Sequence, residues 1–175
     1  MAADIKTKYP STSSVDLTIT LASLATGSAG VYTTGRESDA VDNTTNNDLD
    51  HLVSGKIRTG TTPTVSRSIN VYAYANLSSA AGTPAYPDVL DGADSAETFT
   101  SANVMNGALK FVASMTVDAT SDRDYFFGPV SVASLFGGIL PKFWGIYVAH
   151  DTAVNLNATG GNHKISYERI QGQTV

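Results

Sequence analysis

Three histidines, His51, His150 and His163, are the residues of this sequence best suited to acid–base or metal chemistry. A helical zinc site needs histidines at set spacings, and no HExxH or HxH pattern is present. His150 and Asp151 are adjacent, like a base beside its orienting acid. Neighbouring residues of a strand point to opposite faces, so this pair is badly placed to act together. We predict a surface position or a satisfied hydrogen bond for each histidine.

Carboxylates gather in two short stretches that could form loops. A calcium loop of the helix–loop–helix type needs ligands at alternate positions and a glycine at the sixth. The first stretch has carboxylates at a spacing of three, so it does not fit. We predict acidic surface loops with Asx turns in both places, and an irregular calcium site is the alternative. The carboxylates are Asp88, Asp91, Asp94 and Glu97 in the first stretch and Asp118, Asp122 and Asp124 in the second.

The sequence has none of the motifs that support nucleophilic catalysis or phosphate binding. The chain has no cysteine, no G-x-S-x-G elbow and no P-loop ending in G-K-[ST]. The glycines of "GGILPKFWG" do not have the dinucleotide spacing. We therefore expect a protein that is not an enzyme, with no catalytic residue, no bound cofactor and no metal centre.

Charge and hydropathy exclude two classes of partner. The 175-residue chain has a net charge of -5, and its densest basic stretch is only Lys56-Ile57-Arg58. A nucleic-acid partner needs a basic footprint, so we expect none. The N-terminal "MAADIKTKYPSTSS" lacks the apolar core of a signal peptide, and no apolar run approaches the ~18 residues of a membrane span. We expect synthesis in a cytoplasm and no membrane partner.

The elements that must position these residues are strands. Alternation of apolar and polar residues predicts half-buried strands at 14–22, 68–75, 109–117 and 163–170, with Phe111 and Met115 on one face of the third. The segment 143–150 has apolar residues on both faces, as in a strand that is covered on both sides. Weaker strands are predicted at 30–34, 49–59 and 124–128, with Gly55 as a bulge or bend. Short helical turns are predicted within 94–110 and 131–138.

Many short strands, few helices and no β–α alternation predict an all-β protein. We expect an antiparallel two-sheet sandwich, jelly-roll-like, with a lectin-like sandwich as the alternative. Residues 1–12 form a polar N-terminal arm, either disordered or docked, and residues 13–175 form a single domain.

The stretch "GRESDAVDNTTNNDLDHLVSGKIRTGTTPT", Gly35 to Thr64, begins with charged residues, continues with Asn and Thr, and ends in a short alternating run. Its Asn and Thr side chains bond to nearby backbone, so we expect a structured turn. A polar corner with few long flexible side chains suits a wet contact between proteins. The candidate interface residues here are Arg36, Asp42, Asn43 and Asp50.

The same run, together with "INVYAYANLS", "YPDVL" and "LPKFWGIYVAHDTAVNLNATGGNHKISYERI", resembles small all-β virion-associated proteins of tailed bacteriophages. The resemblance extends from about Gly35 to the end of the chain. It implies a structural role as a capsid decoration (cement) protein or another virion component, commonly a trimer located where capsomers meet. The resemblance establishes no functional residue, so none is transferred.

These expectations give one leading function and two alternatives. The leading one is a homotrimeric decoration protein that is made in the host cytoplasm, binds the major capsid protein and stabilises the head. Its self-contact would use the Tyr72 and Tyr74 face or the segment with Leu135 and Phe136, although the latter could equally close the sandwich end. The second is a tail or fibre component that binds glycans through exposed aromatics such as Tyr74. The third is a sugar-acting enzyme, which would need a pair of carboxylates in a cleft.

Overall fold

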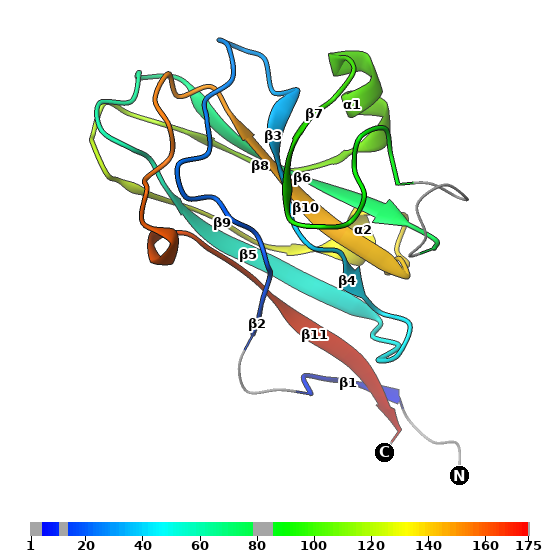
Figure 1. The fold of residues 1–175 in the computed structure, drawn as a ribbon. Helices are drawn as coiled ribbons and strands as arrows, with labels where there is room; N and C mark the ends of the chain where they lie inside the picture. Colours follow the sequence, from blue (N-terminus) through cyan, green and yellow to red (C-terminus); the bar gives the residue numbers. More distant parts are fainter. Residues whose placement is uncertain (1–4, 11–13, 79–85, 175) are drawn as a thin grey trace.

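Two antiparallel sheets form the protein in a computed structural model that describes residues 5–10, 14–78 and 86–174 (Figure 1). The first sheet contains β1 (Ile5–Lys8), β2 (Val15–Asp16), β11 (Lys164–Thr174), β5 (Asp50–Arg58) and β9 (Asp124–Ser131). The second contains β7 (Ser95–Thr98), β3 (Thr34–Glu37), β4 (Val41–Asp42), β10 (Phe143–His150), β6 (Ser68–Asn76) and β8 (Lys110–Thr116). The described residues also include α1 (Ala102–Ala108), α2 (Val132–Leu135) and the 3-10 turn η1 (Gly160–Asn162).

The strand order is that of a jelly roll. One sheet has the order β2-β11-β5-β9 and the other β3-β10-β6-β8. The first strand of the chain in this order pairs with the last, the second with the last but one, and so on, as in one long hairpin folded over into two sheets. The antiparallel pairs are β2–β11, β3–β10, β5–β9 and β6–β8. The predicted all-β two-sheet sandwich is confirmed, and its connectivity is jelly-roll-like rather than that of the lectin-like alternative.

The main core lies between the sheets and uses one face of each central strand. Ile69 and Val71 of β6 and Trp144 and Ile146 of β10 are fully buried there, together with Ile57 of the opposite sheet. Burying aliphatic and aromatic side chains of this size contributes roughly 1.5–3 kcal/mol each. This core holds the two sheets in a fixed relation.

A second apolar cluster covers the outer face of the β6–β10 sheet. Tyr72, Tyr74 and Tyr147 lie beneath side chains from the β6–β8 connection, which carries β7 and α1 (Figure 1). β6 and β10 approach closely at Gly145, where a Cβ atom would collide with the ring of Tyr74. The prediction that β10 is covered on both faces is confirmed.

The first predicted strand is the largest departure from expectation. Only Val15–Asp16 pairs as a strand, although Leu17 and Leu21 are buried as the alternation predicts. The Leu17 N–H donates to Ile165 of the first sheet, whereas the Thr18 carbonyl accepts from Asp39, which precedes β4 of the second. The segment therefore crosses between the sheets and cannot continue along either ladder. The strand predicted at 30–34 begins only at Thr34.

Bulges correct one prediction and confirm another. The β6–β8 register slips between Val71, opposite Ala113, and Tyr72, opposite Phe111. The slip moves Phe111 to the face of Tyr72, against which its ring packs edge-on at 5.7 Å, so the predicted sharing of a face with Met115 is wrong. The β5–β9 register shifts between Val53 and Gly55, as the position of Gly55 predicts.

Both predicted helical segments are present and short. Ser101 caps α1 by accepting the Val104 N–H, and Ser131 caps α2 by accepting the Ser134 N–H. Among the described residues, neither helix has the length and apolar run needed to cross a bilayer.

Candidate interaction site

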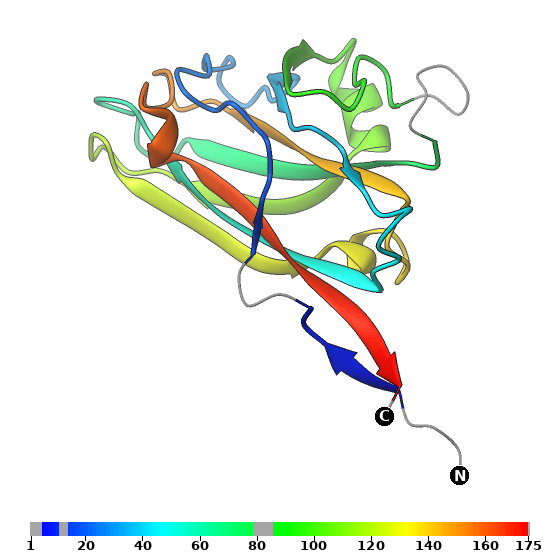
Figure 2. The ribbon, with the colours of Figure 1, turned by 60° about the horizontal axis from the view of Figure 1, so that its bottom comes forward.

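A two-stranded ribbon extends beyond the body of the sandwich (Figures 1 and 2). β11 pairs with β5 from Lys164 to Ile170 and then with β1 from Gln171 to Thr174. Residues 5–8 of the predicted polar arm are thus docked on the C-terminal strand, while residues 1–4, 11 and 12 lie outside the described residues. The ribbon therefore consists of β1, residues 5–8, and the end of β11, residues 171–174.

The register gives the ribbon two chemically different faces. Ile5 lies opposite Thr174 and Thr7 opposite Gly172, and directly paired residues share a face. Leu49 joins this face, because its Cδ1 and the Cγ2 of Ile5 both lie 3.4 Å from the position of a Cβ on Gly172. The other face carries Lys6 opposite Gln173 and Lys8 opposite Gln171. One face is apolar and neutral, and the other is basic and amide-rich.

Large apolar side chains at the ribbon are exposed. Ile5 is 78% exposed, Leu49 58% and Tyr9 57%. Single exposed apolar residues are normal, but three on one small projection suit a surface that is covered by a partner. The edge of β1 adds free backbone donors and acceptors to this surface, because no further strand of the described residues pairs with it.

The root of the ribbon is fixed by a buried carboxylate, Asp48. Its side chain has no exposed surface and accepts from Arg169 Nε at 2.8 Å and Nη2 at 3.1 Å, and from Gln171 Nε2 at 2.7 Å. His51 Nε2 lies 2.9 Å from the same carboxylate. Burial raises the pKa of Asp48, but the hydrogen bonds from Arg169, His51 and Gln171 outweigh it, so the pKa lies below its usual value. Asp48 is therefore ionised and connects β11 to β5.

His51 extends this connection into the main core. Its Nδ1 accepts the Trp144 Nε1–H at 2.9 Å, which leaves Nε2 as the protonated nitrogen that donates to Asp48. Burial lowers the pKa of His51 more than Asp48 raises it, so the ring is neutral near pH 7. The chain Trp144–His51–Asp48–Arg169 is a satisfied internal network, and it holds no surface group for acid–base chemistry.

The polar turn predicted before β5 is confirmed as structured. The Asn43 side chain donates to the Asp48 carbonyl at 3.1 Å and accepts the Asp48 N–H at 2.8 Å. Asp42 accepts the Thr44 N–H and hydroxyl in an Asx turn. Asp50 accepts from Ser131 Oγ and the Ala133 N–H at the start of α2. Asp42 is exposed, whereas Asn43 is buried and Asp50 half-buried, so these last two shape the corner rather than present a contact.

The remaining predicted interface residues lie elsewhere. Arg36 is half-buried on β3 and pairs with Asp94 at 2.5 Å. Tyr74 is fully buried and donates to the Ser38 carbonyl, and Tyr72 is 8% exposed, so the predicted Tyr72/Tyr74 surface is wrong: the β6–β8 connection covers it. Leu135 and Phe136 are half-buried against the main core, as in a closure of the sandwich end.

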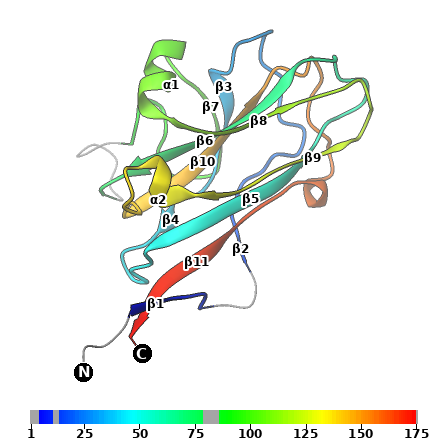
Figure 3. The same cartoon turned by 180° about the vertical axis from the view of Figure 1, so that it is seen from behind.

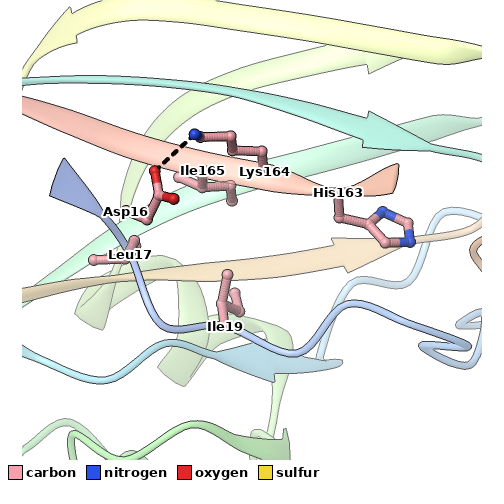
Figure 4. Close-up of a pocket in the computed structure, with 6 residues that line it drawn as sticks. All are labelled: Asp16, Leu17, Ile19, His163, Lys164 and Ile165. Atoms are coloured by element: carbon pink, nitrogen blue, oxygen red, sulfur yellow. Dashed lines mark ion pairs between the residues drawn. The ribbon is translucent and has the colours of Figure 1, made fainter. Parts of the chain in front are cut away.

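A small pocket lies where residues 16–19 pass β11 (Figure 4). Its volume is about 120 Å³, and the Lys164–Asp16 ion pair at 3.0 Å borders it. His163 also lines the pocket, but its Nδ1 accepts the Arg58 N–H and its Nε2 donates to the Asn157 carbonyl at 2.8 Å. Both nitrogens are therefore used internally. His150 is bound similarly by Thr152 and the Leu24 carbonyl, so each histidine has the satisfied hydrogen bonds expected of it.

The acidic stretches use their carboxylates within the fold. Asp88 accepts the Thr100 N–H and hydroxyl, Asp91 accepts the Ala93 N–H, and Asp118 accepts from Thr120 and Tyr125. The Asp91–Ala93 and Asp118–Thr120 bonds are the Asx turns expected, whereas Asp88 bonds to a residue twelve positions later. In the part of the chain that the structure describes, no three His, Cys, Asp or Glu side chains come together as a possible metal site.

Sequence reasoning missed Asp48, Arg169 and Gln171 as a unit. The signal was weak, because Asp48 lies in an Asn/Asp-rich turn and its partners lie more than a hundred residues later. Ile5 was within the predicted arm but was not singled out. Comparison of the chain with known protein families, curated proteins and solved structures found no match.

Proposed function

We propose that this protein is a non-enzymatic structural component of a tailed-phage virion, a capsid decoration protein that forms a homotrimer and binds the major capsid protein lattice. The observation that carries the proposal is the ribbon, whose β11 strand is bonded to Asp48 at its root and beside which Ile5, Leu49 and Tyr9 are exposed. Exposed apolar side chains that lie together mark a surface for contact with a partner, as a cement protein has.

Two further features support the proposal. The jelly roll recurs in viral capsid proteins, although a fold alone does not define a function. Hydrogen bonds within the polar loops, as in the Asn43–Asp48 turn, fix the loop backbone before any contact forms. Such loops lose little conformational entropy on binding a partner. Modest contacts of this kind multiply when one trimer binds several neighbours.

The test is the copy number of this chain in purified particles relative to the major shell protein, by quantitative mass spectrometry. We expect a ratio near one or a simple fraction that icosahedral symmetry allows. Removing the chain should then lower the temperature at which the head releases its DNA. Absence from the particle would refute the proposal.

The second candidate is a tail or fibre component that binds glycans. It is favoured by Phe126 of β9, which is 69% exposed. Phe126 is paired with Lys56, and its neighbour Phe127 lies in the core, so Phe126 is on the outer face of the sheet that contains β5 and β9. Figure 3 shows these two strands side by side. Phe126 borders a shallow hollow of about 380 Å³ with Ser54, Lys56, Lys164 and Ser166. An exposed ring beside polar groups is the arrangement that stacks on a sugar, and it replaces the buried Tyr74 in that role. Only a few copies per particle would favour this candidate.

A further inference from the structure

Two edge strands of the sandwich, β1 and β7, have opposite chemical character. β1 ends the first sheet and β7 ends the second, and neither has another strand on its outer side among the described residues. The edges at the other side of the sandwich, β8 and β9, contact each other. A free edge has unpaired N–H and C=O groups that can pair with another chain.

The β1 edge is basic and is protected against pairing with itself. Lys6 and Lys8 lie on one face of the strand and are exposed. When two β1 strands pair antiparallel about a twofold axis, the lysine faces of both strands lie on the same side of the sheet. Each lysine is then directly opposite a lysine of the other copy. Like charges in such positions destabilise a strand pair. The sequence of this edge therefore fits an acidic strand.

The β7 edge carries two neighbouring carboxylates that have no cationic partner in the described part of the chain, Glu97 of β7 and Glu37 of the adjacent strand β3. Glu37 has no exposed surface and accepts the N–H groups of Asp91 and Gly92 at 3.0 and 3.2 Å. The Ser95 hydroxyl lies 3.3 Å from Glu37 and 2.8 Å from Glu97, so the three side chains share one face of the β3–β7 pair. Within the described residues, no Lys or Arg forms an ion pair with Glu37 or Glu97.

We propose that β1 of one copy pairs antiparallel with β7 of a second copy. With Lys6 opposite Glu97, Lys8 lies opposite Ser95, so both lysines approach the Glu37–Glu97 pair on one face. On the other face, Ile5 lies opposite Thr98 and Thr7 opposite Ala96, which covers the exposed Ile5 side chain. Such a contact uses different surfaces on the two copies, so repetition closes a ring when the rotation allows, and a trimer is such a ring.

This inference deepens the proposed function, because it names the surfaces that form its trimer. It is tested on the purified chain alone, so its failure is distinct from a failure to find the chain in particles. A chain that trimerises but is absent from virions would support the contact and refute the virion role.

The experiment measures self-association by sedimentation equilibrium and native mass spectrometry. We expect the wild-type chain to trimerise and the double variant Lys6→Glu/Lys8→Glu to associate at least ~10-fold more weakly. Glu97→Lys should weaken association similarly. The triple variant with all three changes exchanges the charges across the contact and should restore trimers.

The matched control is Lys110→Glu/Lys142→Glu, which makes the same charge change at two exposed lysines away from β1 and β7. This control should trimerise like the wild type, and circular dichroism should show all variants folded. Should Glu97→Lys fail to fold, Glu97→Gln together with the Lys6/Lys8 variant still tests the edge. A monomeric wild type, trimers that are unaffected by Lys6→Glu/Lys8→Glu, or no restoration in a folded triple variant would each overturn the proposal.

Discussion

Asp48 and Glu37 are two carboxylates with fully buried side chains, and their surroundings give them opposite properties. Asp48 has Arg169 beside it at 2.8 Å, and its pKa is lowered. Burial raises the pKa of Glu37 from 4.5 to about 7, although the N–H groups of Asp91 and Gly92 act against this shift. Burial thus penalises both charges, and at Asp48 the hydrogen bonds from Arg169, His51 and Gln171 outweigh this penalty. One carboxylate fixes the ribbon, and the other leaves an uncompensated charge beside a free strand edge.

The largest expected effect comes from removing the charge of Asp48. Asp48→Asn leaves Arg169, which is 23% exposed, without its anion and should lower the free energy of unfolding by on the order of 3 kcal/mol. Urea unfolding measures the loss, and hydrogen exchange should show reduced protection in β1 and the end of β11. Asp42→Asn, at an exposed acid of the same turn, should leave protection of the ribbon unchanged. Equal losses in the two variants would contradict the role of Asp48.

A smaller effect follows from neutralising Glu37. Its folded pKa of about 7 lies above its ordinary 4.5, so the folded state binds the proton more tightly. Stability from this group is complete below pH 4.5 and is lost as the pH rises through 7, by roughly 3 kcal/mol at most. Glu37→Gln should remove this loss.

The measurement for Glu37 is the unfolding free energy of both proteins from pH 4 to 8. Burial lowers the pKa of His150 to about 4, which makes stability rise between pH 4 and 6.5, but wild type and variant share this contribution. The difference between them isolates Glu37. A difference that does not change with pH would show that Glu37 does not titrate in this range.

The smallest expected effect comes from Trp144→Phe, which removes the indole N–H that His51 Nδ1 accepts. An unpaired buried acceptor and a smaller ring should together cost about 2 kcal/mol. The loss should leave exchange protection of the ribbon unaltered, because Asp48 keeps its bonds to Arg169 and Gln171. Urea unfolding and hydrogen exchange of the variant check both statements. If hydrogen exchange in the ribbon is as fast in this variant as in Asp48→Asn, the ribbon is held by the Trp144–His51 contact in the core and not by Asp48.

Alternation in the sequence predicted most of the sandwich because it reports local burial. Alternation predicted the core-facing residues of β6, Ile69 and Val71, although this strand is buried on both faces and not half-buried as expected. Apolar residues on both faces of β10 predicted its double-sided burial. Alternation by itself carries no information on what covers a second face. It failed where long-range packing decides, as in residues 17–21, whose alternating burial comes from crossing between sheets. It also could not show that the aromatic face of β6 is covered by residues 86–109, since that depends on how the connection folds back.

The candidate site was predictable only in part. The turn around Asn43 has a local signature, because Asn and Asp bond to their own neighbourhood. The anchor at Asp48 depends on a strand that follows more than a hundred residues later, and nothing in the spacing of single residues reveals it. The exposed Ile5 looks like any apolar residue in a polar arm until β11 is placed beside it.

The position of β11 also affects how the molecule is made. Val15 pairs with Tyr167 and Lys8 with Gln171, so one sheet joins the two ends of the chain. Pairings between such distant residues are slow to form, because a long loop must close first. Residues 164–174 must therefore be synthesised before β1, β2 and β5 can pair with them in the first sheet. The basic edge at Lys6 and Lys8 thus becomes an ordered strand only after β11 has been made, although β1 lies more than 150 residues earlier in the sequence.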